Sequence, residues 1–229
     1  MTAVQPLTTE PDLRAGSMTI DVHVPDGEFG AESWHKELVE FRGEVLHGLG
    51  LPSSGDHDGH DEVAYHLIAR LPTGEIVGAA RFAPLENLDP SWVLDVEPQA
   101  GDLLDQQGLT PEDVVEGGRW LVAAPHRHSG VGRSLILSGA SVTLRLGRKL
   151  VWVLAGTAHG QDILLTRMGF HPASDKIHPM PGLGYPVRLL TARTAALLDA
   201  QETGPRPEGI SGAEDSRSPA RNHLKGQPQ

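Results

Sequence analysis

The chain has 229 residues and a formal net charge of −11 at pH 7, and it contains no cysteine. This length favours one sizeable core with loose ends over two domains. The acidic balance argues against nucleic acid as the main partner, because binding a phosphate backbone needs a basic surface. The lack of cysteine excludes disulfides and a thiolate nucleophile, and it is compatible with the cytoplasm. No apolar run is long enough to span a membrane and no signal-peptide pattern begins the chain, so we expect neither a membrane partner nor export.

The N-terminal third predicts a flexible arm, a strand and a helix. Residues 1–17 are polar and aperiodic, which is typical of a flexible arm. Residues 18–24 alternate in polarity and predict a first strand. A helix that ends near Gly48 or Gly50 is predicted by apolar residues at helical spacing, namely Trp34, Leu38, Phe41, Val45 and Leu49.

The loop over residues 52–62 is rich in groups that can ligate metals. Its candidates are Asp56, His57, Asp58, His60 and Asp61. Such residues bind zinc or iron when a regular element fixes their geometry. They also suit a solvated loop, and no regular element is predicted here, so we expect no metal site.

The next segments predict a hairpin followed by a largely irregular stretch. Residues 64–71 and 75–83 are strand-like and are joined by Pro-Thr-Gly, which favours antiparallel pairing. Residues 84–107 are irregular, with Trp92, Val93 and Leu94 expected to pack inward and a short helix over 102–106. Thr110 and Pro111 have the form of a helix start. We expect any helix there to be short, because two glycines interrupt before a strand that begins at Arg119.

Residues 116–137 predict a strand, a glycine loop and a helix. The strand runs through Trp120 to Ala123 and breaks at Pro125, and helical periodicity resumes after Gly132. A helix that begins at such a loop presents N–H groups with no intrahelical partner, and these favour a bound anion. We expect a local positive surface at the loop from Arg127, Arg133, Arg145, Arg148 and Lys149.

The remaining elements complete a βαβ unit and end the domain. Residues 150–154 suit a central strand, which makes strand, loop, helix and strand a unit with a right-handed crossover. A short helix over 159–168 and a last strand over 185–191 follow. We expect one domain over residues 18–195 and a disordered tail over 201–229.

The pattern Arg127-x-x-Gly130-x-Gly132, preceded by Leu-Val-x-x-Pro, resembles the acyl-CoA pyrophosphate loop of the GNAT superfamily of N-acyltransferases. The end of the helix over 159–168, in Gly-Phe, is also similar to that superfamily. A nearer resemblance is to the acyl-homoserine-lactone synthases and the related N-acyl amino acid synthases. It rests on three stretches that together span most of residues 34–191, namely Phe41-Arg42 through Asp58-Gly-His-Asp61 to Tyr65, then Gly78-Ala-Ala-Arg81-Phe82-Ala-Pro84, and Glu116-Gly-Gly-Arg119-Trp120.

The resemblance implies an α/β (α+β) fold of three layers. It has a mixed, mostly antiparallel sheet, helices on both faces and a splayed central pair of strands. It also implies acyl-CoA as co-substrate. The expected binding residues are Leu121, Val122, Ala123, Arg127, His128, Ser129, Gly130, Val131, Gly132, Arg133 and Ser134. Backbone N–H groups of residues 121–123 would face the thioester, and the loop would hold the pyrophosphate.

The proposed chemistry is direct attack of an amine on the thioester, which needs a proton acceptor. Glu116 is the candidate base, acting through a water; the alternative is an ion pair with Arg119, which requires a bulge to bring both to one face. Arg81 and Arg119 could bind a carboxylate of the acceptor or could organise the loop at Asp58 and Asp61. Leu165 stands where many GNAT enzymes have the tyrosine that protonates the thiolate, so that role is unassigned.

We therefore expect a cytoplasmic N-acyltransferase that uses acyl-CoA, or an acyl carrier protein, to acylate a small amino-acid-like amine. Two alternatives remain open: a lactone-type signal synthase acting on S-adenosylmethionine, and a non-catalytic module that binds an acyl thioester. Whether the chain forms a homodimer is also open.

Overall fold

The computed structural model describes residues 18–25, 29–30, 32–52, 58–158, 160–180 and 184–202. Its centre is an eight-stranded sheet in the order β1-β2-β3-β4-β5-β8-β6, with β7 also paired to β8. The strands are β1 (Thr19–His23), β2 (Tyr65–Arg70), β3 (Ile76–Pro84), β4 (Val114–Val122), β5 (Leu150–Gly156), β6 (His171–Pro172), β7 (His178–Pro179) and β8 (Pro186–Arg193). The pairing of β4 with β5 is parallel and the other recorded pairings are antiparallel, as expected for a mixed, mostly antiparallel sheet.

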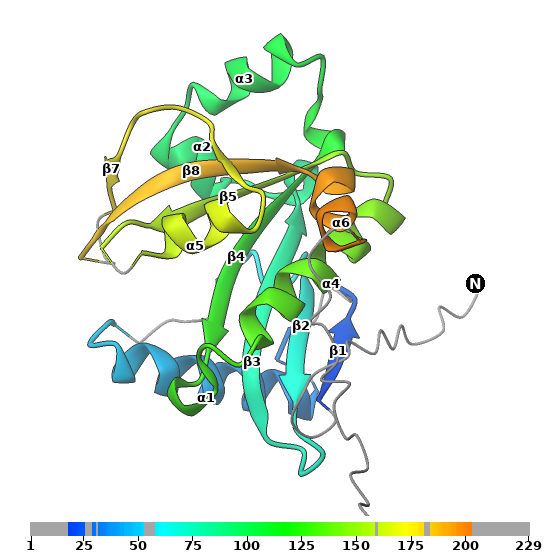
Figure 1. Ribbon diagram of the computed structural model, residues 1–229, viewed down its shortest axis with the longest axis vertical. Helices are drawn as coiled ribbons and strands as arrows, with labels where there is room; N and C mark the ends of the chain where they lie inside the picture. The colour runs from blue at the N-terminus through cyan, green and yellow to red at the C-terminus, as the bar shows by residue number, and fades with distance from the viewer. Residues whose placement is uncertain are drawn as a thin grey trace, which may run out of the picture.

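Helices cover both faces of this sheet (Figure 1). They are α1 (Ser33–Gly48), α2 (Trp92–Val96), α3 (Ala100–Gln106), α4 (Val131–Arg145), α5 (Gln161–Arg167) and α6 (Thr194–Glu202), with short 3-10 turns η1 (Leu85–Asn87), η2 (Pro111–Asp113) and η3 (Ala124–His126). One face packs against α1, and against α2 and α3 further along. The other face packs against α4, α5 and α6 and holds the largest core cluster. The three-layer prediction is confirmed.

The central strands separate as the resemblance predicts. β4 pairs with β5 only from Val114 to Gly117, opposite Leu150 to Val153. Beyond Gly117 and Val153 the two strands diverge, and the opening lies between α5 and α1 (Figure 1). Backbone groups on the facing edges of the two strands are therefore free of sheet pairing with each other, and a ligand can enter between them.

β4 corrects one detail of the sequence prediction. The strand begins at Val114 rather than at Arg119, and Gly117 and Gly118 lie within it. The register against β3 shifts between the pairs Ala79–Leu121 and Arg81–Gly118, so β4 carries one extra residue there. Arg119, with φ of +50°, adopts the left-handed conformation in this bulge. The glycines do not stop the strand, because it is held on both sides by neighbouring strands.

Two helices were not predicted. α2 occupies part of the stretch expected to be irregular, and it begins where Ser91 Oγ accepts a hydrogen bond from the Leu94 N–H. Its Val93 is fully buried, as expected.

The second helix that was not predicted is α6. It packs on α4 and buries Leu197, so the fold continues beyond the expected boundary at residue 195. The predicted arm, 1–17, lies outside the described residues, as does the predicted tail, 201–229, apart from residues 201 and 202, which belong to α6 and are not disordered. No helix in the described ranges has the length and apolarity that crossing a membrane requires.

Candidate active site

The glycine loop connects the open end of β4 to α4. Gly130 precedes the helix with φ of +93°, a conformation that favours glycine because it lacks a Cβ. The N–H groups of Val131, Gly132 and Arg133 precede the first intrahelical bond, which Ser134 N–H makes to the Gly130 carbonyl. The loop is therefore a candidate anion site as predicted, except that the Ser134 N–H is already used inside the helix.

The cationic side chains divide between the two ends of α4. Arg127 and Arg133 are exposed at the loop, where Arg127 Nε donates to the Val122 carbonyl at 3.3 Å. Arg145 lies at the far end of the 15-residue helix, about 22 Å away at 1.5 Å per residue. There Arg148 bonds to Glu86 and Lys149 pairs with Asp113. The expectation that Arg145, Arg148 and Lys149 gather beside the loop was wrong, because a helix separates them from it.

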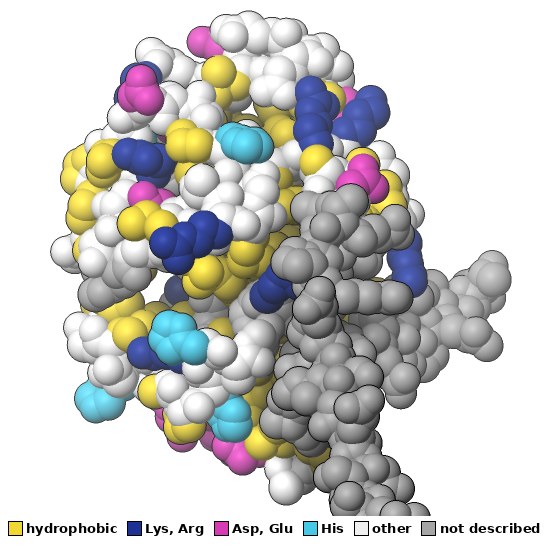
Figure 2. Space-filling model, in the orientation of Figure 1, with side chains coloured by type: hydrophobic (Ala, Val, Ile, Leu, Met, Phe, Trp, Pro, Cys, Tyr) yellow, Lys and Arg dark blue, Asp and Glu magenta, His cyan; other side chains and the backbone are white. Residues whose placement is uncertain are grey.

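A cleft of about 510 Å³, which we call the main cleft, passes through the splay between β4 and β5. On the viewed face, hydrophobic, basic and histidine side chains surround the hollow between α5 and α1 (Figure 2). The cleft is lined by the glycine loop, the C-terminal half of α1 and one side of α5. It includes His126, Arg127, His128, Gly130, Gly132, Arg133, Trp120, Leu121, Val122, Leu164 and Met168. Seven of the eleven predicted binding residues thus line one space, which has one polar end and an apolar middle. The other four, Ala123, Ser129, Val131 and Ser134, do not line it.

The open edge of β4 offers fewer backbone donors than predicted. Ala123 N–H donates to the Val77 carbonyl in β3, so it is not free to face a ligand. Successive N–H groups along a strand point to opposite edges. Leu121 therefore faces β3 as Ala123 does, and the N–H of Val122 points to the splayed edge. Val122 is the one member of the predicted trio whose backbone donor is directed at the main cleft.

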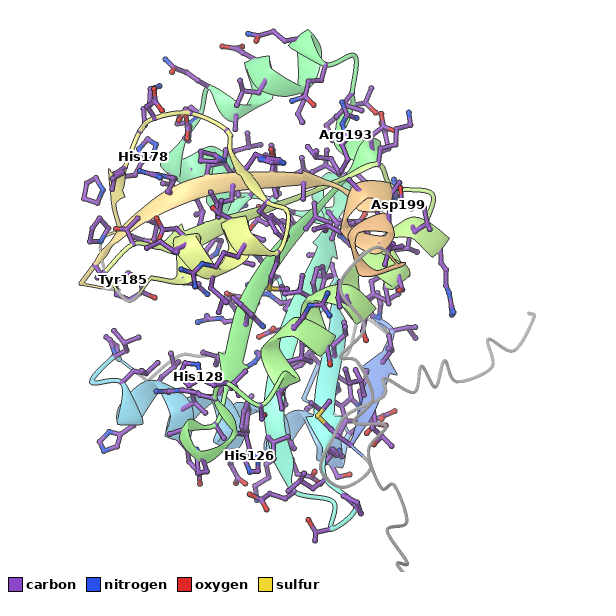
Figure 3. The ribbon with its side chains drawn as sticks, in the orientation of Figure 1. His126, His128, His178, Tyr185, Arg193 and Asp199 are labelled. Atoms are coloured by element: carbon purple, nitrogen blue, oxygen red, sulfur yellow. The ribbon has the colours of Figure 1, made fainter. Side chains whose placement is uncertain are left out.

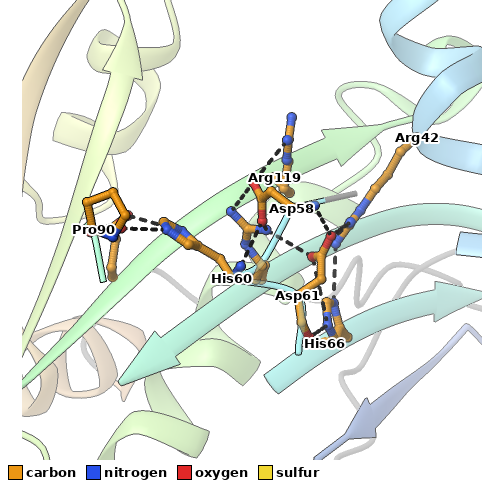
Figure 4. Close-up of polar contacts among 9 residues, drawn as sticks. Arg42, Asp58, His60, Asp61, His66, Pro90 and Arg119 are labelled. Carbon is orange, nitrogen blue, oxygen red and sulfur yellow. Dashed lines mark hydrogen bonds and ion pairs between the residues drawn. The ribbon is translucent and has the colours of Figure 1, made fainter. Parts of the chain in front are cut away.

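A buried ionic network lies on the α1 face of β3 and β4 (Figure 4). Arg42 NH1 donates to both oxygens of Asp61, at 3.0 and 3.1 Å, and both side chains are fully buried. Arg81 donates to Asp61 at 2.9 Å and to Asp58 at 2.5 Å, and Arg119 donates to Asp58 at 3.3 Å. Of the two roles considered for Arg81 and Arg119, these bonds favour organising the loop at Asp58 and Asp61. The same bonds occupy the carboxylates that suggested a metal site; Asp56 and His57 lie outside the described residues.

His66 and Asp61 hold shifted pKa values within this network. Burial and the neighbouring Arg42 lower the pKa of His66 to about 4. His66 Nε2 lies 2.9 Å from the Asp61 carbonyl and Nδ1 lies 3.2 Å from Arg42 NH2, so a neutral ring donates through Nε2 and accepts through Nδ1. Burial alone would raise the pKa of Asp61, but Arg42 and Arg81 outweigh it and lower that pKa to about 2.

Glu116 is buried and faces α2, on the same side of the sheet as the network. Its Oε2 accepts from Ser91 Oγ at 2.5 Å and from the Val93 N–H at 3.4 Å. Its Oε1 lies 4.0 Å from Nδ1 of His60. The other nitrogen of His60, Nε2, lies 2.7 Å from the Pro90 carbonyl, which can only accept. The neutral His60 ring therefore carries its proton on Nε2 and turns the lone pair of Nδ1 toward Glu116.

The bulge in β4 places Glu116 and Arg119 on one face, which the sequence analysis had made the condition for their pairing. Each nevertheless has other recorded partners, Ser91 for Glu116 and Asp58 for Arg119. The guanidinium of Arg119 also lies 5.4 Å from the centre of the Trp92 ring. The two residues share a pocket of about 120 Å³, the Glu116 pocket, whose lining also includes Arg81, Trp92, Met180 and Tyr185.

A third space, the inner cavity, lies on the α4 side of the splay and has a volume of about 50 Å³. Its lining comes from β3, β4, β5, α4 and α5, and it is mostly apolar, with Arg119 and Gln161 as its polar side chains. Trp120 and Gln161 line all three spaces: the main cleft, the Glu116 pocket and the inner cavity. The Trp120 indole is held by a 3.0 Å hydrogen bond from Nε1 to the Gly132 carbonyl, and Gln161 Oε1 accepts from the Gly156 N–H at 2.8 Å. The three spaces therefore adjoin at two anchored side chains, and we call this place the junction.

Sequence reasoning missed several residues of this site. Tyr185 lines both the main cleft and the Glu116 pocket, packs against Gly156, and lies across the opening from His126 and His128 (Figure 3). Burial raises the pKa of its phenol, and Arg119 opposes that rise. Its one sequence signal is rarity, since the chain has two tyrosines. Ser91, by contrast, has the signature of a helix cap before an apolar run and could have been found. Leu165, at the position of the missing tyrosine, is buried in the core.

Residues 41–136 match the family model of the acetyltransferase (GNAT) domain. Over these 96 residues the chain is similar to the GNAT acetyltransferase domain. The match runs from α1 through β4 and the glycine loop into the first turns of α4, so it includes the ionic network, Glu116 and the proposed anion site. Among curated proteins, none matches the sequence.

Several solved structures share this fold. TofI, in a complex with an inhibitor and MTA, is 24% identical with a TM-score of 0.56, over 79% of this chain and 96% of TofI. BjaI, a CoA-dependent acyl-homoserine lactone synthase solved with SAM and isopentyl-CoA, is 19% identical with a TM-score of 0.59, over 80% and 87%. MesI, another CoA-dependent acyl-homoserine lactone synthase, is 18% identical with a TM-score of 0.58, over 85% and 97%. Two CoA-dependent acyl-homoserine lactone synthases are thus among the structures similar to this chain.

Proposed function

We propose that this protein transfers an acyl group from acyl-CoA to the amine of a small amino-acid-like acceptor by direct attack. The observation that carries the proposal is the junction of three spaces between Trp120 and Gln161. A thioester under attack has three arms: the thiol carrier, the acyl chain and the incoming amine. The main cleft suits the pantetheine arm, the inner cavity suits the acyl chain and the Glu116 pocket suits the amine.

The glycine loop supports CoA as the carrier. Its orphan N–H groups and the exposed guanidinium groups of Arg127 and Arg133 lie at the end of the main cleft, where the pyrophosphate would bind. The pantetheine would then follow β4 inward along the splayed edge. The Val122 N–H could pair with a pantetheine amide there, or stabilise the oxyanion. An acyl carrier protein presents the same pantetheine with one phosphate and is the alternative donor.

Glu116 is the proposed proton acceptor for the amine. Its hydrogen bonds from Ser91 and Val93 fix one carboxylate oxygen, while the other lies 4.0 Å from Nδ1 of His60. A proton that leaves the attacking amine would pass to Glu116, directly or through a water, and His60 would stabilise the protonated pair by sharing that proton. His60 would act as a positioning residue, because it reaches the amine only through Glu116.

Tyr185 is the proposed donor of the proton that the departing thiolate takes up. Its side chain borders both the carrier arm and the amine arm of the junction, and its raised pKa keeps the phenol protonated at neutral pH. Tyr185→Phe should slow transfer from acyl-CoA about tenfold or more, and should slow transfer from an aryl thioester less, because an aryl thiolate leaves without protonation. Equal slowing with both donors would remove this role.

The in-class alternative is a lactone-type synthase acting on S-adenosylmethionine, which the fold shared with BjaI and MesI favours. The Glu116 pocket, at about 120 Å³, has room for about ten groups of water size, which suits an amino acid better than a nucleoside-bearing acceptor. The size of the pocket is therefore our reason for ranking the small acceptor first.

Thiol release by the full chain tests the proposal. Acyl-CoA and acyl carrier protein would each be offered with a panel of amino acids and with S-adenosylmethionine, and products identified by mass. We expect amine-dependent release of CoA with at least one amino acid. Release only with S-adenosylmethionine would establish the lactone-type alternative. Tight binding of acyl-CoA without release by any amine would identify a non-catalytic module instead.

A further inference from the structure

The inner cavity is closed at a defined point in the sheet. Gly117 and Val153 form the last paired residues of β4 and β5, and both line the cavity, so its inner end is the apex of the splay. Trp120, Leu154 and Gln161 lie beyond that apex on the diverging strands and on α5. A chain that enters at the junction therefore runs toward Gly117 and Val153 and stops there.

The ring of Phe82 forms the floor at this apex. Phe82 is paired with Gly117 across β3 and β4 and is almost completely buried. Its ring tip lies against α4 at Gly139, where an added Cβ would come within 2.0 Å of Cζ. The ring thus spans the gap from the sheet to the helix, and the lack of a side chain at Gly139 lets it do so. Helix and sheet hold the floor from both sides, so it cannot swing aside without moving α4.

The volume that remains is small. About 50 Å³ holds about three to five groups of water or methylene size. The neighbouring lining residues, Ala80, Ile136 and Leu165, are buried and apolar, so this part of the space accepts hydrocarbon. Arg119 and Gln161 are the polar side chains in the lining. A longer chain would have to displace Phe82 or turn back into the main cleft, where the pantetheine arm lies.

We propose that the donor is a short-chain acyl thioester, of about six carbons or fewer counting the carbonyl, and that Phe82 sets this limit. The proposal rests on the proposed function for the placement of the thioester. It adds the class of acyl group and names the residue that selects it. Chain-length selection then arises at the apex of the splay, because the cavity ends there.

The test measures binding and turnover with a series of acyl-CoA donors from acetyl to decanoyl, using the full chain. Calorimetry gives Kd, and release of CoA with the best amine gives kcat/KM. Wild-type protein should prefer butanoyl or hexanoyl donors and discriminate against octanoyl by about tenfold or more, since one excess methylene costs about that much in a closed pocket. Equal or tighter binding and use of decanoyl-CoA would overturn the proposal.

Two substitutions should move the preference in opposite directions. Phe82→Leu lengthens the cavity, and the octanoyl to butanoyl ratio should rise about tenfold. Ala80→Val fills part of it and should shift the optimum toward acetyl. Phe170→Leu is the matched control, because Phe170 is equally buried in the same cluster but does not line the cavity. An equal shift in Phe82→Leu and Phe170→Leu, or no shift in Phe82→Leu and Ala80→Val, would overturn the role of Phe82.

The outcomes separate this inference from the proposed function. If the wild-type protein releases no CoA with any amine, the acyltransferase proposal is contradicted. The Kd values for the series of acyl-CoA donors still show how long a chain the cavity accepts. Turnover that is indifferent to chain length contradicts the inference alone.

Discussion

The ionic network behind Glu116 and the glycine loop border the same splay, yet they satisfy their charges differently. Arg42, Arg81 and Asp61 are almost fully buried and bond to one another. Arg127 and Arg133 are exposed at the loop. A buried charge must be paired within the fold, whereas an exposed charge is solvated by water until a ligand binds. In the proposed function the network, which we call the frame, would support the pocket of the amine, and the loop would bind the carrier.

The largest expected effect breaks the frame. Asp61→Asn leaves Arg42 and Arg81 buried beside a neutral amide, and we expect a loss of about 3–5 kcal/mol in unfolding free energy, measured by urea denaturation. Asp21→Asn is the control, because the pair of Asp21 with Arg70 is partly exposed and should be worth less than about 1 kcal/mol. A loss below 1 kcal/mol for Asp61→Asn would show that the network does not support the fold.

Acid should weaken the frame. The pKa of His66 is about 4 in the fold and 6.5 when unfolded, so the folded state binds fewer protons and stability is lost as pH falls from 6.5 to 4. The expected loss across that window is about 3 kcal/mol. Asp61, whose pKa is lowered to about 2, adds its own loss between pH 3.8 and 2.

Unfolding measured by urea at a series of pH values checks this. In His66→Gln the amide can donate to the Asp61 carbonyl and accept from Arg42 without titrating, so the slope between pH 6.5 and 4 should flatten. An unchanged slope in His66→Gln would assign the acid sensitivity to other groups.

Glu116 lies on the same side of the sheet as the frame and is the proposed base. Glu116→Gln keeps the shape and removes the base, so kcat should fall about 10²-fold or more while KM for acyl-CoA stays near the wild-type value. Steady-state kinetics check this against Glu112→Gln, an exposed neighbour on η2. His60→Gln should lower kcat less and shift the acid limb of its pH profile. A His60→Gln profile that is superimposable on the wild type would exclude the proton-sharing role.

The smallest effect concerns the loop. Arg133→Ala should raise KM for acyl-CoA about 5–30-fold, as expected for the loss of one charge-assisted contact, and leave transfer from an N-acetylcysteamine thioester unchanged because that donor has no phosphate. Arg145→Ala at the other end of α4 is the matched control. Equal effects on both donors would mean that Arg133 does not contact the pyrophosphate.

The difference between the two regions also explains what the sequence could reveal. Residues 116–137 are contiguous, and they predict a strand, a glycine loop that is a candidate anion site, and a helix. The pairs of the frame join distant segments, such as Arg42 with Asp61 and Glu116 with Ser91, and no local pattern encodes which arginine meets which carboxylate. The resemblance named residues that the fold brings close together, but choosing between the two roles considered for Arg81 and Arg119 needed their hydrogen bonds.

Elements were predicted well where burial is periodic and poorly where contacts decide. The helix over α1, the hairpin of β2 and β3, and the helix and strand after the loop follow from their apolar spacing. α2 has five residues, too few for a helical period to appear. β4 begins before Gly117 and Gly118 and continues through them, because pairing with β3 and β5 outweighs the low strand propensity of glycine.

The bulge at Arg119 has a consequence for comparing sequences. An extra residue reverses the alternation of side chains, so Glu116 and Arg119 face the ionic network while Trp120 faces α4. A relative with one residue fewer at this point would exchange the faces of every later position in the strand. A single-residue gap in an alignment here would therefore mark a change in which residues face each substrate, even where the neighbouring letters are identical.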